Sequence, residues 1–190
     1  MTQLSGFTKN LKGVFADAVR NPRILDFVKK TTARGAERFI TKDKFLEGET
    51  DGVLIARISD NFTLNLLDKI EVNVEDAKLN IHRLREQSYD MPIIHELGGE
   101  KIVETSLSHF WSLLKRQGHG GDGDLLTNGY ANIVYVRDSQ GILWAVRAYW
   151  HSNDPRIRRG WRIEAYPVEL VKDPFGWDID LQVISLAQAA

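Results

Sequence analysis

The sequence predicts an α+β protein in which N-terminal helices are followed by a mainly antiparallel sheet of meander topology. Two observations support this fold class. Apolar residues recur at helical intervals over much of the first half, whereas from Tyr130 onward they alternate with a period of two. Eight of the ten Trp and Tyr residues also lie in 130–177, within the alternating part. We expect at least one helix to pack on this sheet.

The composition limits the classes of protein to which the chain can belong. Its 190 residues are 43% hydrophobic and 27% charged, which is typical of a folded domain with one substantial core. The absence of cysteine excludes disulfides, thiolate metal sites and a thiol nucleophile. No window has the roughly 18 uninterrupted apolar residues of a membrane span, and the first residues lack a secretory leader pattern. We therefore predict a cytoplasmic protein.

The first 47 residues are predicted to form a basic helical arm or subdomain, followed by an α+β domain over 48–190. Leu4, Phe7, Leu11 and Phe15 share one face of a helix over 3–20. Asn21-Pro22 is a typical start for a second helix, which would carry residues 24–28. Residues 1–44 hold ten Lys and Arg against four acids, which gives a charge of +6 and leaves −7 for the remainder. Such an asymmetry favours docking of the arm on the acidic domain or on an anionic partner.

The middle of the chain contains weaker signals. Residues 53–58 favour a strand, although a buried helix fits as well, and Ile70, Val72 and Val74 alternate as in a strand. Glu75-Asp76 is expected to open a helix over the following residues up to Leu84. Gly98-Gly99, between two β-prone runs, indicates a two-residue hairpin.

One helix and four strands are expected in the second half. Thr105 or Ser106 caps a helix over 105–117, which ends at Gly118. The strands are expected in "YANIVYVRD", "ILWAVRAYWH", "WRIEAYPVE" and "WDIDLQVIS", each separated from the next by turn residues. Four such strands in succession predict the antiparallel meander.

The segment "RQGHGGDGDLLTNGY" (116–130) contains five glycines, a composition that loops binding a phosphate or a metal ion often share. It matches G-x-G-x-x-G, but a helix precedes it and a strand follows, which reverses the order in a dinucleotide site. Leu126 and Ile133 stand where a calcium loop needs oxygen ligands. A looser divalent metal site made by His119, Asp122 and Asp124 stays open. We predict a flexible connector between a helix and a strand, and no cofactor.

The alternation within the expected strands places polar residues on common faces. Arg147, Tyr149 and His151 share one face of their strand, as do Arg162, Glu164 and Tyr166 in the next. If the two faces coincide, Arg147, Tyr149, Arg162 and Tyr166 could bind an anionic or aromatic ligand. The alternative is a half-solvated face with cross-strand pairs between arginine and glutamate.

Function is predicted from these features and from the motifs that fail. We expect a non-enzymatic interaction protein that binds a protein partner, or itself, through the basic N-terminal helices and the aromatic sheet. The alternative is a small-molecule or hydrolytic pocket between helix 105–117 and the sheet. In that pocket His119 or His151 would act as acid or base, Asp122 or Glu164 would orient it, and Arg147 would clamp an anion. Nucleic acid and membrane are less favoured partners, because acidic residues predominate after the arm.

Overall fold

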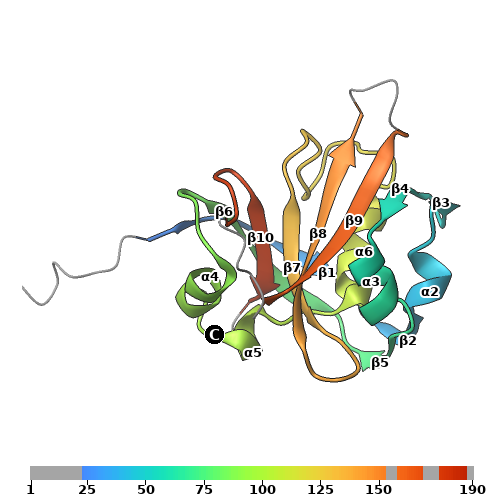
Figure 1. Ribbon diagram of the computed structural model, residues 1–190, viewed down its shortest axis with the longest axis horizontal. Helices are drawn as coiled ribbons and strands as arrows, with labels where there is room; N and C mark the ends of the chain where they lie inside the picture. The colour runs from blue at the N-terminus through green and yellow to red at the C-terminus, as the bar shows by residue number, and fades with distance from the viewer. Residues whose placement is uncertain (1–22, 153–157, 169–175, 188–190) are drawn as a thin grey trace, which may run out of the picture.

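The computed structural model describes residues 23–152, 158–168 and 176–187, and its main element is an eight-stranded sheet (Figure 1). In spatial order the strands are β1 (Leu25–Ala33), β6 (Ala77–Leu84), β10 (Gln182–Leu186), β7 (Asn132–Arg137), β8 (Leu143–His151), β9 (Gly160–Pro167), β4 (Val53–Ile58) and β3 (Gly48–Thr50). A second sheet pairs β2 (Ala36–Ile40) with β5 (Ile70–Val74). The helices are α2 (Thr41–Lys44), α3 (Asp60–Asn65), α4 (Asp90–Glu96), α5 (Glu100–Val103) and α6 (Leu107–Arg116).

The predicted meander is wrong for the sheet as a whole, because the sheet is mixed. Strands β7, β8 and β9 are consecutive antiparallel neighbours, as expected from their turns. However, β10 does not continue from β9: it lies between β6 and β7 and runs parallel to β7, and β4 runs parallel to β9. The position of β10 follows from its buried residues, with Val183 and Ile184 in the cores on opposite faces of the sheet. Such a strand needs neighbours on both sides, and local turn signals do not specify them.

The predicted N-terminal helices are also wrong where the structure describes them. Residues 25–33, within the expected second helix, form β1, which pairs with β6. A bulge between Phe27 and Lys29 interrupts the alternation of this edge strand, so its apolar residues imitate helical spacing. The β-branched Val28, Thr31 and Thr32 favour the extended conformation. The first expected helix, over 3–20, lies outside the described residues.

Two predictions in the middle of the chain are wrong: a predicted helix is a strand, and a predicted hairpin turn connects two helices. Residues after Glu75-Asp76 form strand β6 rather than a helix, since Leu79 and Ile81 enter the core between β1 and β10. Gly98-Gly99 connects α4 to α5 rather than two strands of a hairpin. By contrast, strands β4 and β5 and helix α6 are confirmed, and Ser106 caps α6 by accepting a hydrogen bond from the His109 N–H (3.0 Å).

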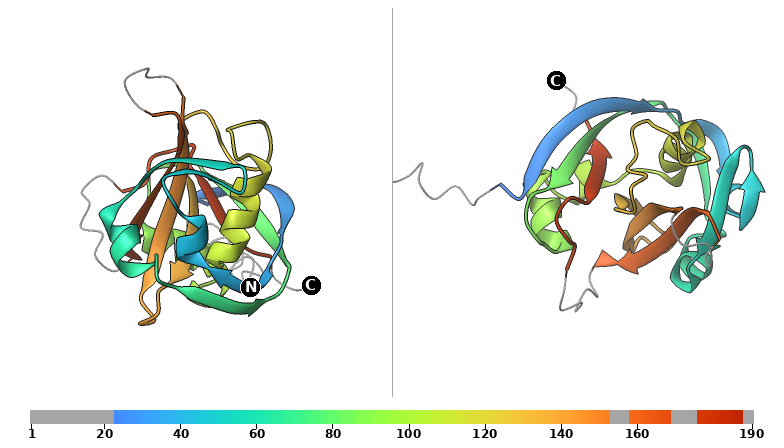
Figure 2. Two further views of the ribbon diagram at one scale, coloured as in Figure 1. Left: turned by 90° about the vertical axis from the view of Figure 1, so that its right-hand side faces the viewer. Right: turned by 90° about the horizontal axis from the view of Figure 1, so that it is seen from above.

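The sheet is curved, and α6 lies inside the curve (Figure 2). The core on this side combines Leu107, Phe110 and Leu114 of α6 with side chains from β1, β4 and β6–β10. On the opposite side α4 and α5 cover the part of the sheet around β10 and β7, where Ile93, Ile94 and Val103 are buried. Helix α3 lies against β9, and its Asp60 and Asn61 line a pocket together with Arg162, Glu164 and Tyr166 of that strand. None of the described helices is long and apolar enough to cross a membrane.

Candidate functional site

The glycine-rich segment after α6 is held in place by the side chain of Gln117, which is only 2% exposed. Its Nε2 donates to the carbonyl oxygens of Gly121 (2.7 Å) and Leu125 (3.0 Å), and its Oε1 accepts from the Leu125 N–H (2.7 Å). The glycines permit this close packing: a Cβ on Gly120 would overlap the ring of Trp150, and one on Gly123 would overlap Gln117 itself. The segment connects a helix to a strand, as predicted, but these contacts anchor it to the core, whereas the prediction was a flexible connector.

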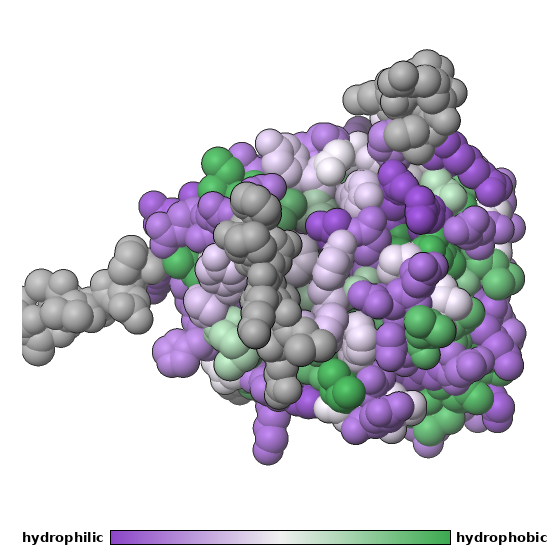
Figure 3. Space-filling model, viewed as in Figure 1, coloured by the Kyte–Doolittle hydropathy of each residue, from purple (hydrophilic) through white to green (hydrophobic). Residues whose placement is uncertain are grey.

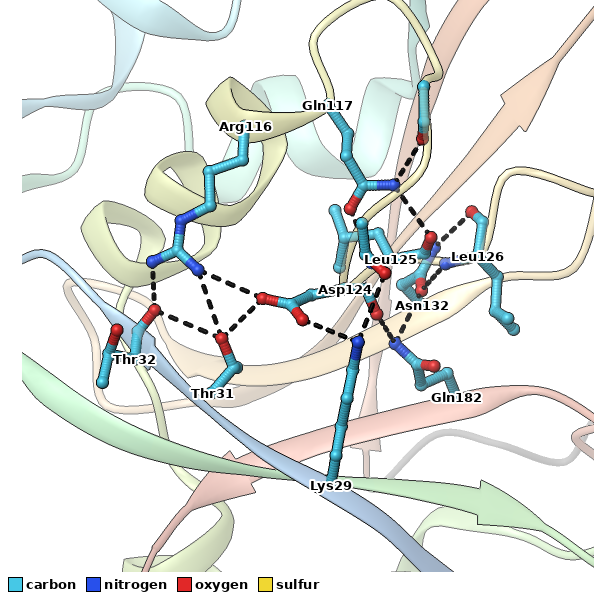
Figure 4. Close-up of polar contacts among 12 residues, drawn as sticks. Lys29, Thr31, Thr32, Arg116, Gln117, Asp124, Leu125, Leu126, Asn132 and Gln182 are labelled. Carbon is cyan, nitrogen blue, oxygen red and sulfur yellow. Dashed lines mark hydrogen bonds and ion pairs between the residues drawn. The ribbon is translucent and has the colours of Figure 1, made fainter.

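Asp124 fixes the end of the same segment against β1 (Figure 4). Its carboxylate accepts from Lys29 Nζ (2.7 Å), Thr31 Oγ1 (2.5 Å) and Arg116 Nη1 (3.1 Å). Arg116 also donates to the carbonyl oxygen of Thr32. Partial burial opposes ionisation, but the bonds from Lys29 and Thr31 and the charges of Lys29 and Arg116 outweigh it, so the pKa of Asp124 lies below its usual value. The ionised carboxylate therefore holds the end of the glycine-rich segment against β1 and α6.

The three candidate metal ligands are not brought together. The Asp124 carboxylate forms ion pairs with Lys29 and Arg116. Asp122 is exposed, and His119 Nε2 lies 3.2 Å from Glu49 Oε1 on the surface. Within the described ranges no three His, Asp or Glu side chains form a group that could hold a metal ion.

The polar residues predicted to share a sheet face do so, on the side opposite α6. We call Arg147, Tyr149, Arg162, Glu164 and Tyr166 the arginine–tyrosine face. Arg147 lies opposite Glu164 and Tyr149 opposite Arg162 in the pairing of β8 with β9. Hydrophilic side chains predominate over β9 and β4 in Figure 3, which is viewed from this side.

A hydrogen-bonded network occupies the centre of the arginine–tyrosine face. Arg147 Nε donates to Glu164 Oε2 (2.7 Å), and the hydroxyls of Tyr149 (3.0 Å) and Tyr166 (2.9 Å) donate to the same carboxylate. The Arg147 guanidinium also lies 4.9 Å from the ring centre of Tyr166 and 5.8 Å from that of Trp177. Arg147 is thus satisfied by its own neighbours, which agrees with the expected cross-strand pair.

Burial and the contacting groups determine the pKa values of Glu164 and Tyr166 in this network. Burial opposes ionisation of Glu164, but the charge and hydrogen bonds of Arg147 prevail, with help from the two tyrosines, and its pKa is lowered. Burial, together with the neighbouring Glu164 carboxylate, raises the pKa of Tyr166 to about 12. Glu164 is therefore an ionised acceptor and Tyr166 a neutral donor at neutral pH, and neither has the pKa of a general acid or base for that range.

The other residues of the expected hydrolytic pocket are dispersed. Apolar side chains fill the interface between α6 and the sheet, and Arg147 and Glu164 lie on the far side of that sheet. His119 is on the surface beside Glu49, and His151 is at the end of β8, opposite Gly160. The structure therefore does not bring His119 to Arg147 between helix and sheet.

A buried carboxyl group that the sequence did not single out is linked to the arginine–tyrosine face through Trp177, whose ring lies against Tyr166 and Arg147. Asp90 Oδ1 accepts from Tyr135 Oη (2.8 Å) and Trp177 Nε1 (2.7 Å), and Oδ2 has no hydrogen-bond partner among the described residues. Burial raises the pKa of Asp90 more than these two hydrogen bonds lower it.

A basic pocket of about 540 Å³, also missed, lies on the outer side of α6. The pocket is bounded by α6, the β1–β2 turn, β2 and α2, and its floor includes Trp111, which is 5% exposed. The turn is fixed to the helix because the Arg34 N–H donates to Ser112 Oγ (2.9 Å). The charged residues of the lining are Arg34, Arg38, Lys44, Lys115, Arg116 and Asp51.

The basic pocket has an excess of positive charge, with five cations and one carboxylate. Lys44 Nζ pairs with Asp51 Oδ2 at 2.6 Å, and this hydrogen bond, with the charges of Lys44 and Lys115, lowers the pKa of Asp51. Arg116 pairs with Asp124. The side chains of Arg34, Arg38 and Lys115 have no ion pair with any described residue. Three cations are therefore available to an anionic ligand.

The sequence carried a partial signal for this pocket. The +6 charge of residues 1–44 includes Arg34, Arg38 and Lys44, but it was assigned to a helical arm. Lys115 and Arg116 fall in the last turn of the helix predicted over 105–117, where no sequence pattern marks them as part of a site. Comparisons with protein-family models, with curated proteins and with solved structures give no match, so the site is interpreted from its own geometry.

Proposed function

We propose that the protein binds a multiply charged, phosphate-bearing small molecule in the basic pocket. The observation that carries this proposal is the gathering of five cations and a single carboxylate around a space of about 540 Å³. That volume suits a small ligand. Like charges held close together repel one another, and a bound polyanion would offset this repulsion.

The chemistry of the pocket favours phosphate over other anions. Arginine guanidinium groups bind phosphate oxygens with two parallel hydrogen bonds, and lysine adds a point charge. Ser108 and Ser112 contribute hydroxyl groups to the lining. The buried rings of Phe39 and Trp111 form an apolar floor that would lower the local dielectric constant and strengthen these interactions.

The proposal is tested by isothermal titration calorimetry with tripolyphosphate, inorganic phosphate and sodium acetate at constant ionic strength. Affinity should rise with the charge of the anion. Replacing Arg34, Arg38 or Lys115 by alanine should weaken tripolyphosphate binding about tenfold each, the value of one charge-assisted hydrogen bond. Lys101→Ala is the matched control, since Lys101 is an exposed cation on α5, outside the pocket.

Equal weakening by Lys101→Ala would indicate attraction by net charge alone and would refute a defined pocket. Absence of tripolyphosphate binding would refute the proposed function. This proposal differs from the small-molecule alternative predicted from the sequence, which expected the ligand between helix 105–117 and the sheet, because the basic pocket is on the outer side of α6. The protein partner remains a prediction that depends in part on residues 1–22, outside the described ranges. A cytoplasmic location likewise remains a prediction from the sequence.

A further inference from the structure

Two arginines lie side by side on the sheet face opposite α6. Arg57 of β4 and Arg162 of β9 are directly paired in the parallel register of these strands. The next pair, Ile58 and Ile163, packs in the core on the α6 side, so the arginines point the other way. Like charges at paired positions destabilise a sheet unless a counter-charge is present.

Neither arginine forms an ion pair with such a counter-charge within the described residues. The ion pairs of the described residues include neither Arg57 nor Arg162, and the guanidinium carbon of Arg162 lies 5.9 Å from the centre of the Tyr149 ring. The Nε of Arg162 is buried and has no hydrogen-bond partner. A buried donor without an acceptor is costly, so the hydrogen-bonding capacity of this guanidinium group is not satisfied by its own chain.

A pocket of about 420 Å³ adjoins both arginines. Ser59 lies in its wall and accepts hydrogen bonds from the N–H groups of Phe62 and Ala165 (each 3.3 Å), which leaves its own O–H able to donate. The pocket therefore presents two guanidinium groups and a hydroxyl donor.

The net charge of the residues that line the pocket indicates which kind of anion it would bind. Two carboxylates also line the pocket, but Glu164 is neutralised by Arg147. Arg57 and Arg162 then stand against Asp60 alone, which leaves a net charge of +1. A polyphosphate would meet repulsion from Asp60, whereas a single carboxylate matches both the charge and the bidentate geometry of a guanidinium group. We propose that Arg57, Arg162 and Ser59 form a binding site for a monocarboxylate, separate from the basic pocket.

The site is tested by NMR of the arginine Nε–Hε groups in the full chain. Titration with sodium benzoate should shift the Arg162 Nε–Hε signal in a saturable manner with a Kd of about 1 mM, as expected for two charge-assisted bonds less the cost of ordering. Benzamide, which has the same shape without the charge, should not shift this signal. Equal responses to both compounds would overturn the proposal.

Variants separate this site from the basic pocket. Benzoate binding, followed through the Ser59 amide signal, should weaken at least tenfold in Arg162→Gln and in the exposed Arg57→Gln, and should be unchanged in Arg34→Gln. Thermal unfolding of each variant checks that it folds, and Arg57→Gln keeps the test valid if Arg162→Gln does not. Unchanged binding in Arg57→Gln would also overturn the proposal. Weaker tripolyphosphate binding in Arg34→Gln with benzoate binding intact would establish the two sites as independent.

A second arm identifies the source of the carboxylate. A short peptide with a free C-terminus is compared with the same peptide amidated at that end. Binding of both benzoate and the free peptide would extend the site to peptide C-termini, and binding of benzoate alone would restrict it to small carboxylic acids.

Discussion

Replacement of Gln117 by alanine should destabilise the protein by about 3 kcal/mol. The side chain makes three hydrogen bonds, all at 3.0 Å or less, and an intramolecular hydrogen bond contributes about 1 kcal/mol to stability. The loss leaves the buried N–H and C=O of Leu125 without these partners, which makes this a lower estimate. For a chain of this size the loss corresponds to a decrease in Tm of about 6–12 °C.

Urea unfolding measures this loss, and hydrogen exchange of the Leu125 amide shows whether the segment opens locally. Gln87→Ala is the control, because Gln87 is exposed, and its effect should stay within about 0.5 kcal/mol. Gln117→Glu should be at least as destabilising as the alanine variant at neutral pH, since a carboxylate oxygen would then face the two carbonyl groups. A loss below about 1 kcal/mol in Gln117→Ala, with the Leu125 amide still protected, would refute the role of this side chain as the anchor of the glycine-rich segment.

Three further predictions concern stability. Gly120→Ala should cost about 3 kcal/mol in urea unfolding, from its positive φ of 73° and overlap with Trp150, whereas Gly121→Ala, which meets open space, should be neutral. The lowered pKa of Asp124 means that its stabilising contribution is present above about pH 4 and is lost as the pH falls through the folded-state pKa; Asp124→Asn should abolish this decline in urea midpoints measured below pH 5. The raised pKa of Asp90 has the opposite sign, because stability should fall as the pH rises from about 4 through the folded-state pKa, and Asp90→Asn should remove that fall; an unchanged pH profile in that variant would contradict the assignment.

The parts of the fold that the sequence predicts are those encoded by neighbouring residues. Helix α6 has a cap at Ser106 and one continuous apolar face, and β7–β9 are joined by turns that bring each strand beside the next. Strand β6 is not encoded by its neighbouring residues in this way, since the spacing of Ala77, Ile81 and Leu84 fits a helix as well as a strand. Its conformation is decided by β1 and β10, which lie more than 40 and nearly 100 residues away along the chain.

The same distinction applies to the candidate sites. The arginine–tyrosine face was predictable because two adjacent antiparallel strands align their alternating residues, as Arg147 and Glu164 do. The basic pocket was not, because Arg34 and Lys115 meet only after β1 has packed beside α6. The pairing of Arg57 with Arg162 depends on a parallel contact between strands separated by about a hundred residues, which no local pattern encodes.

The insertion of β10 between β6 and β7 has a consequence for the order of folding. A growing chain can assemble β7–β9 as soon as those residues are available, but β1 and β6 cannot join them in one sheet until β10 arrives to bridge the gap. Until then the edges of β6 and β7 that will pair with β10 expose unpaired backbone groups, which are prone to association with other chains. Synthesis of the last described strand is thus the step that closes the sheet, and a chain arrested before residue 182 would carry two unpaired strand edges, one on β6 and one on β7.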